Sequence, residues 1–259
     1  MDPEYKRTAI EAALKSGRLI RNSVGKIETI SYKGRDNIVT DVDKKSERII
    51  INLIRSRFPG HSILSEEIGA IDKGSQYRWI IDPLDGTTNF AHAFPFFCVS
   101  IALETEGEIS VGVIYDPIRD ELFSAEHGQG AYLNKRKIEV SGVKRLSGAF
   151  LSTGFSYGRR RKDKNVGNFR KFLLKAMAIR RAGSAALDLS YVACGRFDGF
   201  WERDLHAWDS AAGFLIVKEA KGMVTKFDGS VYSPYDQDIL ATNGKIHPQM
   251  VSVLRSVKI

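Results

Sequence analysis

Residues 79–90 read Trp79-Ile80-Ile81-Asp82-Pro83-Leu84-Asp85-Gly86-Thr87-Thr88-Asn89-Phe90. Two carboxylates, Asp82 and Asp85, lie three positions apart where an apolar segment gives way to small residues. Residues 78–81 are expected to form a buried strand that Pro83 ends, and residues 86–88 are expected to begin a short helix. The first N–H groups of a helix have no partner within it, so they can bind an anion. This segment therefore suits a metal ion held beside a phosphate ester.

An Asp-Gly turn with a capping Asp is the simplest alternative for the same segment. It explains Asp85 and Gly86, because both residue types are common in tight turns. It does not explain Asp82, a second acid at the end of an apolar strand. The metal and phosphate interpretation accounts for both acids.

Other acids stand at the ends of apolar or helical segments. They are Glu66 and Glu67 after the apolar strand 63–65, Asp209 at the start of an amphipathic helix, and Asp41 and Asp43 before the helix expected at residues 44–58. A solvated turn is the ordinary explanation of a Glu-Glu pair, and capping that of an acid at a helix start. Capping explains one of Asp41 and Asp43 and leaves the other spare.

Taken together, these segments resemble the three signatures of the inositol monophosphatase family. The signatures correspond to Glu66-Glu67, to residues 82–90, and to Trp208-Asp209 within residues 208–213, and their order and spacing fit. The family contains Mg²⁺-dependent, lithium-sensitive phosphomonoesterases and related fructose-1,6-bisphosphatases. The resemblance extends from the first helix nearly to the C-terminus. It implies a layered αβαβα sandwich with the metals between two halves.

The resemblance also implies two or three Mg²⁺ ions and their ligands. Glu66, Asp82 and Asp85, with the carbonyl of Leu84, would hold the first metal, and Glu66 would count among the catalytic residues. Asp82, Asp85 and Asp209 would hold the second. Asp209 is the one proposed ligand from the C-terminal half, as a site between the halves requires.

Water activation and phosphate binding involve a second group of residues. By resemblance, Asp43 lies near a third, weaker metal, and Thr87 orients the attacking water, with Asp43 as a possible proton relay. The N–H groups of Gly86, Thr87 and Thr88 are expected to bind the nonbridging phosphate oxygens through the helix dipole.

Substrate contacts are expected from four further places. By resemblance, Glu202 accepts hydrogen bonds from the hydroxyls of a polyol, and Ala185 lines the same pocket. Residues 31–43 are read as a mobile flap, or as an ordinary surface loop, whose Lys33 can approach a phosphate. The basic cluster Arg159–Lys164 is read as a solvated loop, or as a contact of Arg159 with the second phosphate of a bisphosphate substrate.

The implied activity is that of a phosphoric monoester hydrolase acting on inositol 1-phosphate. A phosphate monoester repels hydroxide, so its hydrolysis needs cations that neutralise the oxygens and lower the pKa of the attacking water. No covalent intermediate is expected, because Asp82 and Asp85 are three positions apart and lack the two-residue spacing of aspartyl-phosphate phosphatases.

Two alternatives stay open. One is a fructose-1,6-bisphosphatase, a dual-specificity enzyme, or another sugar or nucleotide phosphatase on the same scaffold, since the metal ligands do not separate these activities. The other belongs to a different class: a regulatory protein that contacts RNA or the transcription machinery through its basic surface. The complete set of acids argues against a loss of catalysis.

Composition agrees with an enzyme of this type. The 259 residues are 43% hydrophobic and carry a net charge of +8, which suits an anionic substrate and also permits nucleic-acid binding. Nucleic acid is not expected as the main partner, because the basic cluster lacks interleaved aromatic residues. The sequence shows no membrane span or signal peptide, so a cytoplasmic protein is expected. A homodimer that takes a small sugar or polyol phosphate is expected as well.

The order of predicted elements divides the chain into two halves. Residues 1–140 are expected to form an α+β half with an antiparallel sheet and most metal ligands, and residues 141–259 an α/β half that supplies Asp209. Helices are predicted at 5–23, 44–58, 166–178, 184–194, 206–220 and 248–257. Strands are predicted at 96–104, 109–115, 121–126, 131–133, 199–202 and 223–226.

Overall fold

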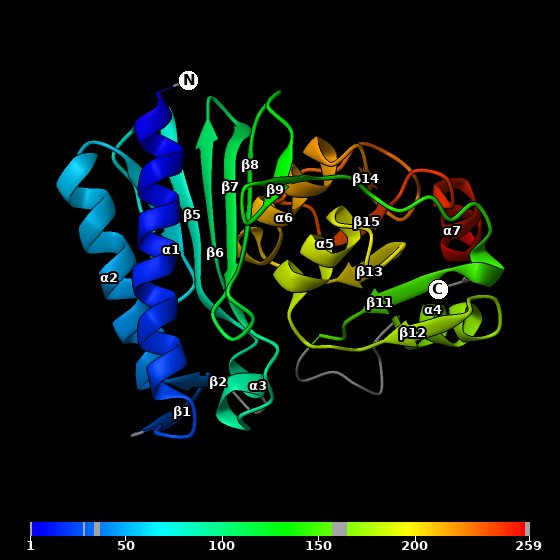
Figure 1. The fold of residues 1–259 in the computed structure, drawn as a ribbon, viewed down its shortest axis with the longest axis horizontal. Coiled ribbons are helices and arrows are strands. Elements are labelled where there is room, and N and C mark those ends of the chain that lie inside the picture. The colour runs from blue at the N-terminus through cyan, green and yellow to red at the C-terminus, as the bar shows by residue number, and fades with distance from the viewer. Residues whose placement is uncertain (1, 28, 34–36, 157–164, 257–259) are drawn as a thin grey trace.

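Layers of helix and sheet alternate through the protein, and the αβαβα sandwich expected from the sequence is confirmed (Figure 1). The structure is a computed structural model that describes residues 2–27, 29–33, 37–156 and 165–256. Within these ranges, no helix combines the length and the apolar character that crossing a membrane requires.

Helices α1 (Pro3–Ser23) and α2 (Asp41–Arg57) pack on each other and cover one face of the larger sheet (Figure 1). Apolar residues recur along each helix at intervals of three and four, so each helix buries one stripe. In α2 this stripe contains Ile50 and Ile54, both fully buried. The two helices form the first layer of the sandwich.

Helix α2 begins earlier than predicted, because Thr40 is its N-cap. The Val42 N–H donates to Thr40 Oγ1 at 3.2 Å, and the Thr40 N–H donates to Asp43 Oδ2 at 2.8 Å. Asp41 and Asp43 therefore lie inside the first turn. Capping accounts for Asp43, whereas Asp41 is paired with Lys45.

The larger sheet has the strand order β10-β9-β8-β7-β6-β5-β3-β4. Only β3 and β5 run parallel, and all the other neighbours described in this sheet run antiparallel, which confirms the predicted meander. The strands are β3 (Ser62–Ser65), β4 (Gly69–Ile71), β5 (Tyr77–Asp85), β6 (Cys98–Thr105), β7 (Glu108–Asp116), β8 (Glu121–Glu126), β9 (Ala131–Leu133) and β10 (Arg136–Ile138).

Strand β5 continues past Pro83 to Asp85, so the prediction that Pro83 ends it was wrong. The ladder with β6 pairs Asp82 with Ser100 and Asp85 with Cys98, and its register shifts between these pairs. Proline has no N–H to donate to a ladder, and it is tolerated where a bulge interrupts the pairing. The bulge lets the strand carry both acids. Helix α3 (Thr87–Ala91) follows, as predicted.

The smaller sheet has the strand order β12-β11-β13-β15-β14. Strand β11 runs parallel to both its neighbours, and β15 runs antiparallel to both of its own. The strands are β11 (Phe150–Thr153), β12 (Ala178–Arg180), β13 (Gly199–Arg203), β14 (Met223–Thr225) and β15 (Asp238–Thr242).

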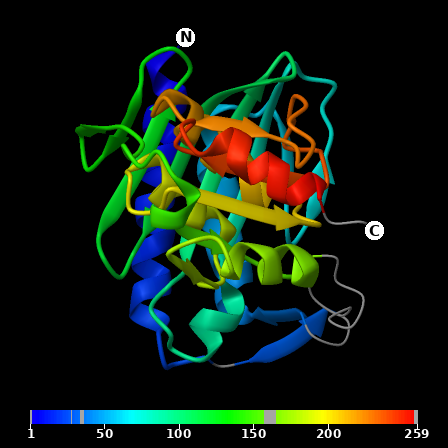
Figure 2. The same ribbon diagram turned by 90° about the vertical axis from the view of Figure 1, so that its right-hand side faces the viewer.

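Helices cover both faces of the smaller sheet. α5 (Ala185–Ala193) and α6 (Ala207–Glu219) lie between the two sheets, and α4 (Asn165–Leu173) and α7 (His247–Arg255) lie on the outer face (Figures 1 and 2). The remaining elements are the short helix η1 (Leu146–Gly148) and a hairpin of β1 (Ile30–Lys33) and β2 (Asn37–Thr40). Residues 31–43, predicted as a loop, thus contain two paired strands and the start of α2.

The C-terminal half contains two errors of prediction. The helix expected over residues 166–178 ends at Leu173, because the Met177 N–H donates to the Ala149 carbonyl at 3.0 Å and residues 178–180 join β11 as a strand. Strand β15 was not predicted, although it is the central link between β13 and β14. In both cases long-range pairing overrides the local pattern. The division of the chain at residue 140 stays a prediction.

Helix α6 is apolar on all sides and joins the two sheets through one continuous core. This core contains Ile80 and Phe123 from the larger sheet and Phe200 and Ile239 from the smaller one. The helix passes so close to β7 that a Cβ atom built on Gly112 would lie 2.7 Å from the Ala212 carbonyl oxygen. Only glycine permits this approach, which fixes the position of α6.

We expect Gly112→Ala to destabilise the protein by about 1–3 kcal/mol, because the added methyl group overpacks the contact between α6 and β7. Gly60→Ala is the matched control, since a Cβ at Gly60 meets nothing within 4 Å. Urea unfolding of both variants measures the effect. Equal unfolding midpoints for the two variants would contradict this account of α6.

Candidate active site

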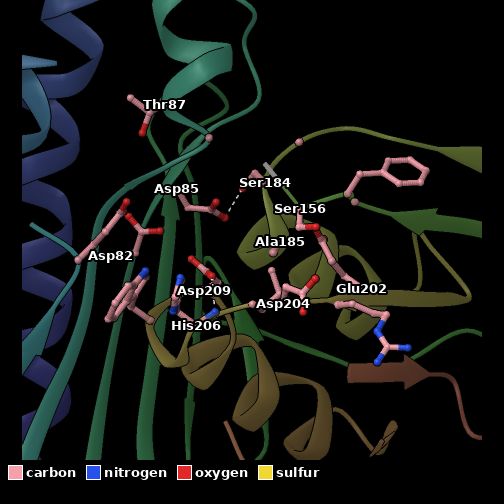
Figure 3. Close-up of a pocket in the computed structure, with 18 of the residues that line it drawn as sticks. Asp82, Asp85, Thr87, Ser156, Ser184, Ala185, Glu202, Asp204, His206 and Asp209 are labelled. Atoms are coloured by element: carbon pink, nitrogen blue, oxygen red, sulfur yellow. Dashed lines mark hydrogen bonds between the residues drawn. The ribbon is translucent and has the colours of Figure 1, made fainter. Parts of the chain in front are cut away.

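A cavity of about 470 Å³ opens between the two sheets and collects most of the predicted site residues (Figure 3). Its walls come from the end of β5, the start of α3, the end of β13 and the N-terminal ends of α5 and α6. The predicted residues that line it are Glu66, Asp82, Leu84, Asp85, Gly86, Thr87, Ala185, Glu202 and Asp209.

Carboxylates of like charge crowd one side of this cavity. Asp82 is only 2% exposed, and its Oδ1 accepts the Leu84 N–H at 2.9 Å. Burial raises the pKa of Asp82 well above its ordinary value, and the negative charges of Glu66, Asp85 and Asp209 raise it further. The ionised acids therefore destabilise one another unless cations lie among them.

Asp85 connects the larger sheet to α5 (Figure 3). Its Oδ2 accepts the Ser184 hydroxyl at 2.6 Å and the Ala186 N–H at 2.8 Å, both at the N-terminal end of α5. Burial raises the pKa of Asp85 to about 6, although both hydrogen bonds oppose the shift. One oxygen is therefore bound to the helix end, and the side chain still lines the cavity.

Asp209 combines the two roles that the sequence left open. Its Oδ2 accepts the His206 N–H at 2.7 Å, which caps α6, and its side chain lines the cavity. Burial raises the pKa of Asp209 well above its ordinary value, and the negative charge of Asp85 raises it further. Ser100 also donates to the Trp208 carbonyl at 3.3 Å, so β6 holds this end of α6.

Glu47 supports the turn that carries Glu66, and the sequence reading missed it. This side chain is 3% exposed, and its Oε1 accepts the N–H groups of Glu67 at 3.1 Å and Ile68 at 3.2 Å. The available signal was its position three residues before Ile50 on the apolar stripe of α2. A buried acid there needs a partner, and the turn provides one.

Thr87 lies between Asp43 and the chain of β5. Its hydroxyl can donate its one proton to Asp43 Oδ1 at 2.9 Å or to the Leu84 carbonyl at 3.0 Å. Asp43 is 1% exposed, and burial raises its pKa to about 6 in spite of hydrogen bonds from Thr40 and Thr87. Asp43 does not line the cavity itself and acts on it through Thr87.

The N-terminal ends of three helices meet at the cavity. Their N-caps are Gly86 for α3, Ser184 for α5 and His206 for α6, and all three residues line the walls. Gly86 has a φ of 94°, and a Cβ atom on it would lie 2.9 Å from the Phe96 carbonyl oxygen. Helix N-termini favour anions. The cavity thus combines carboxylates for a cation with helix ends for an anion.

Comparison with known proteins gives the same family that the motifs suggested. The model of the inositol monophosphatase family matches residues 2–258. The chain belongs to this family.

Individual relatives carry two different names. An inositol-1-monophosphatase of Synechocystis is 46% identical over 95% of this chain and 87% of its own length. The Nus factor SuhB of Pseudomonas aeruginosa is 43% identical over 95% of this chain and 94% of its own. The solved inositol monophosphatase of Anabaena is 44% identical, covers 98% of this chain and 96% of its own, and superposes with a TM-score of 0.90.

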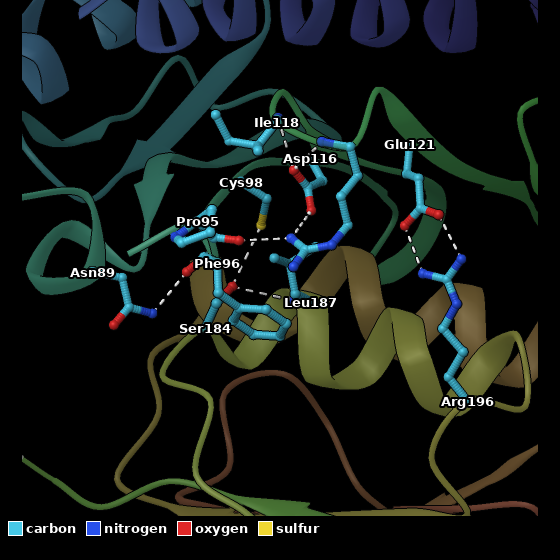
Figure 4. A network of polar contacts seen from close by, with 11 residues as sticks. Asn89, Pro95, Phe96, Cys98, Asp116, Ile118, Glu121, Ser184, Leu187 and Arg196 are labelled. Carbon is cyan, nitrogen blue, oxygen red and sulfur yellow. Dashed lines mark hydrogen bonds and ion pairs between the residues drawn. The ribbon is translucent and has the colours of Figure 1, made fainter. Parts of the chain in front are cut away.

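The loop after α3 is held from both halves of this inositol monophosphatase family protein (Figure 4). Asn89 donates to the Phe96 carbonyl at 2.7 Å and to the Ala182 carbonyl at 2.9 Å, just before α5. Arg119 donates to the Pro95 carbonyl at 2.7 Å. These bonds fix the loop that follows α3, and the sequence predicted none of them.

Two predicted residues that the structure describes, Asp43 and Thr88, do not line the cavity. Lys33 ends β1, and its side chain lies outside the described part of the chain, as does the whole of Arg159. Two cations that were not predicted, Arg181 and Arg203, do line the cavity.

The donors fit a hard cation such as Mg²⁺. Among the residues that the structure describes, no group of three His, Cys, Asp or Glu side chains has the arrangement of a metal site. The lining carboxylates and the Leu84 carbonyl are nevertheless all oxygen donors, the type that Mg²⁺ prefers. Burial and the repulsion between these acids raise the pKa of Asp82, and a cation among the oxygens would relieve the repulsion.

We expect Ser184→Ala to weaken the affinity for Mg²⁺ about 10-fold or more, because Asp85 loses the hydrogen bond of the Ser184 hydroxyl, which helps to orient it. The Mg²⁺ concentration for half-maximal activity measures this, and calorimetric titration with Mg²⁺ repeats it without turnover. Ser190→Ala is the control, since Ser190 is equally buried in α5 but donates to the Ala186 carbonyl. The same Mg²⁺ requirement in both variants would rule out this role.

Proposed function

We propose that this protein is a Mg²⁺-dependent phosphomonoesterase that hydrolyses inositol 1-phosphate or a related polyol phosphate. One observation supports this most: buried carboxylates and the N-terminal ends of α3, α5 and α6 line the same cavity. Metal ligands and an anion-binding surface must be adjacent when a metal acts on a phosphate ester. Membership in the inositol monophosphatase family favours the same reaction.

In this proposal two or three Mg²⁺ ions bind to Glu66, Asp82, Asp85, Asp209 and the carbonyl of Leu84. When bound, Mg²⁺ neutralises phosphate oxygens and lowers the pKa of the attacking water. The carboxylates act as ligands, and the hydrogen bonds to Asp82, Asp85 and Asp209 keep their oxygens in fixed directions.

Thr87 would orient the attacking water. Burial raises the pKa of Asp43 to about 6, so most of it is ionised at neutral pH. Its Oδ1 would then accept the hydrogen bond of the Thr87 hydroxyl. A lone pair of Thr87 Oγ1 can then accept a hydrogen bond from water in the cavity. Asp43 thus fixes the direction of the hydroxyl and can receive the proton that the water loses.

The phosphate and the polyol would bind to different walls. The N–H groups at Gly86 and Thr87 open α3 without a side-chain cap, which suits the nonbridging phosphate oxygens. Glu202 and Ala185 line the wall formed by β13 and α5, and Glu202 would accept hydrogen bonds from the hydroxyls. Thr88, which was expected to bind the phosphate together with Gly86 and Thr87, does not line the cavity.

A fructose bisphosphatase stays a candidate because of Arg181 and Arg203. Both line the cavity, so a second phosphate has cations available apart from the metals. Arg159, which was expected to contact this second phosphate, lies outside the described residues. Arg181 is therefore the better supported candidate for that contact.

A side-by-side assay tests the proposed reaction. The substrates are inositol 1-phosphate, fructose 1,6-bisphosphate, histidinol phosphate and adenosine 3′,5′-bisphosphate, each with Mg²⁺ and with a chelator. We expect Mg²⁺-dependent release of phosphate, fastest from inositol 1-phosphate. Failure to hydrolyse any of the four would refute the proposal.

A role in transcription is the candidate from another class. It rests on the relatives named Nus factor SuhB, which are 43% identical to this chain. Binding of the purified protein to RNA polymerase, measured by calorimetry and unchanged in an Asp82→Asn variant, would support this role. The two functions need not exclude each other, because the second does not require the cavity.

We expect Asp82→Asn to abolish Mg²⁺-dependent phosphatase activity and to raise the melting temperature of the metal-free protein. The fold raises the pKa of Asp82, which means that it disfavours the ionised carboxylate and is less stable for it in the absence of metal. A neutral amide at this position removes that cost. Mg²⁺ should stabilise the wild type strongly and the variant weakly.

Asp228→Asn is the control for this experiment. Hydrogen bonds from Ser230 lower the pKa of this exposed acid, so its replacement should lower the melting temperature slightly and leave the effect of Mg²⁺ intact. An Asp82→Asn variant with full turnover, or with the wild-type response to Mg²⁺, would contradict the proposed ligand set.

We expect Arg181→Gln to reduce kcat/KM for fructose 1,6-bisphosphate about 10-fold and to change that for inositol 1-phosphate much less, because only the first has a second phosphate. The loss should shrink as salt screens the charges. Arg180→Gln is the control, since Arg180 lies over the Phe150 ring and does not line the cavity. Equal losses on both substrates would exclude Arg181 as the distal contact.

A further inference from the structure

Helix α2 has three buried polar side chains on the face that it turns toward the larger sheet. They are Asp43, Ser46 and Glu47, which are 1%, 0% and 3% exposed. Their spacing of three and four residues places them on one side of the helix, in line with the apolar residues Ile50 and Ile54. Buried polar groups are costly unless they are hydrogen-bonded, so each of the three needs a partner.

Glu47 binds the turn on which Glu66 lies. Besides the N–H groups of residues 67–68, its Oε1 accepts the hydroxyl of Ser65 at 2.5 Å. The N–H of Glu66 donates to the Ile81 carbonyl of β5 at 3.2 Å. Residues on both sides of Glu66 are thus bound to one carboxylate oxygen, so the backbone that carries the Glu66 side chain has a fixed position.

Ser46 binds the bulge of β5, which carries two of the proposed metal ligands. Its hydroxyl donates to the Pro83 carbonyl at 2.6 Å. The register of β5 and β6 pairs Asp82 and Asp85 and passes over Pro83 between them. A carbonyl in a bulge needs a partner from outside the ladder, and Ser46 supplies it. The bulge is therefore connected to α2 as well as to β6.

A second serine fixes the direction of the Ser46 hydroxyl. Ser16 on α1 lies in hydrogen-bond contact with Ser46, and both side chains are fully buried. Each hydroxyl has a single proton, and that of Ser46 goes to Pro83, so Ser16 is the donor in the contact between the serines. These bonds run in one direction, from α1 through α2 to β5.

Asp43 completes the set at the N-terminal end of α2, where its Oδ1 accepts the Thr87 hydroxyl. One face of one helix therefore contacts three segments of the site: the turn after β3, the bulge of β5 and the start of α3. Ser46 and Glu47 do not line the cavity themselves.

We propose that Ser46 and Glu47 are positioning residues for the metal site. Glu47 acts through the turn that carries Glu66. Ser46 acts through the bulge between Asp82 and Asp85. This inference rests on the proposed function, in which these acids bind Mg²⁺. A ligand whose backbone is already fixed loses less conformational freedom when the metal binds, so the affinity is higher.

The two serines provide a matched pair of variants. Ser46→Ala removes the bond to Pro83 and should lower the affinity for Mg²⁺ about 10-fold, as expected for a group that orients metal ligands. Ser16→Ala removes an equally buried hydroxyl but leaves the bond from Ser46 to Pro83 in place, so its affinity should stay within about 2-fold of the wild type. Calorimetric titration with Mg²⁺ measures both affinities without turnover. Equal affinities in the two variants would overturn the role of Ser46.

Glu47→Gln and Glu47→Met separate position from charge. Gln keeps an oxygen that can accept the N–H groups of residues 67–68, so the affinity for Mg²⁺ should stay within about 3-fold of the wild type. Met has only a weak acceptor and should lower the affinity about 10-fold or more. Equal losses in both variants would mean that the charge of Glu47 attracts the cation, and would overturn the positioning role.

Hydrogen exchange tests the turn in the metal-free protein. The N–H groups of Glu67 and Ile68 should exchange about 10-fold faster in Glu47→Met than in the wild type, because the acceptor that protects them is lost. Exchange in Glu47→Gln should stay close to that of the wild type. An unchanged exchange rate in Glu47→Met would show that the turn does not depend on Glu47.

The outcomes also distinguish this inference from the proposed function. If the wild type hydrolyses polyol phosphates and both Ser46→Ala and Glu47→Met bind Mg²⁺ normally, the inference fails and the function stands. If the variants differ in Mg²⁺ affinity as expected but the wild type hydrolyses no phosphate ester, the function fails and the inference stands.

Discussion

Like charges buried together are the constraint on which this structure depends. Burial raises the pKa of Asp82, Asp85 and Asp209, and the charges of neighbouring acids raise the pKa of Asp82 and Asp209 further. Such a group is unstable in a dry interior unless dipoles and cations face it. The helix ends of α3, α5 and α6 supply the dipoles, and the layered fold is what brings three helix ends to one place.

Each of these acids uses one oxygen for structure. Asp85 binds the start of α5, Asp209 caps α6, and Asp82 accepts an N–H from the bulge of its own strand. The orientation of the carboxylates is therefore set by regular elements rather than by loops. In the proposed function, this arrangement would hold the metal ligands in the precise positions that metal-assisted chemistry needs.

The sequence predicted those parts of the site that depend on local pattern. Asp82 and Asp85 were recognised from an apolar strand followed by small residues, and Asp209 from its place at a helix start. Glu47 was missed because it is a single acid on a buried helix face, with its partners on a distant segment. The end of α4 was misplaced for the same reason, since Ala149 captures the Met177 N–H. A local sequence pattern carries no information on which distant segments pair with each other.

The continuous core through α5 and α6 decides how the protein can move. Apolar side chains of both sheets pack against the same two helices, so a motion that parts the sheets would expose this core to water. We therefore expect a molecule bound in the cavity to enter and leave through its mouth, with small motions of side chains and of the segments around the rim. The same packing predicts that the two sheets melt in a single cooperative transition, without an intermediate in which only one has unfolded.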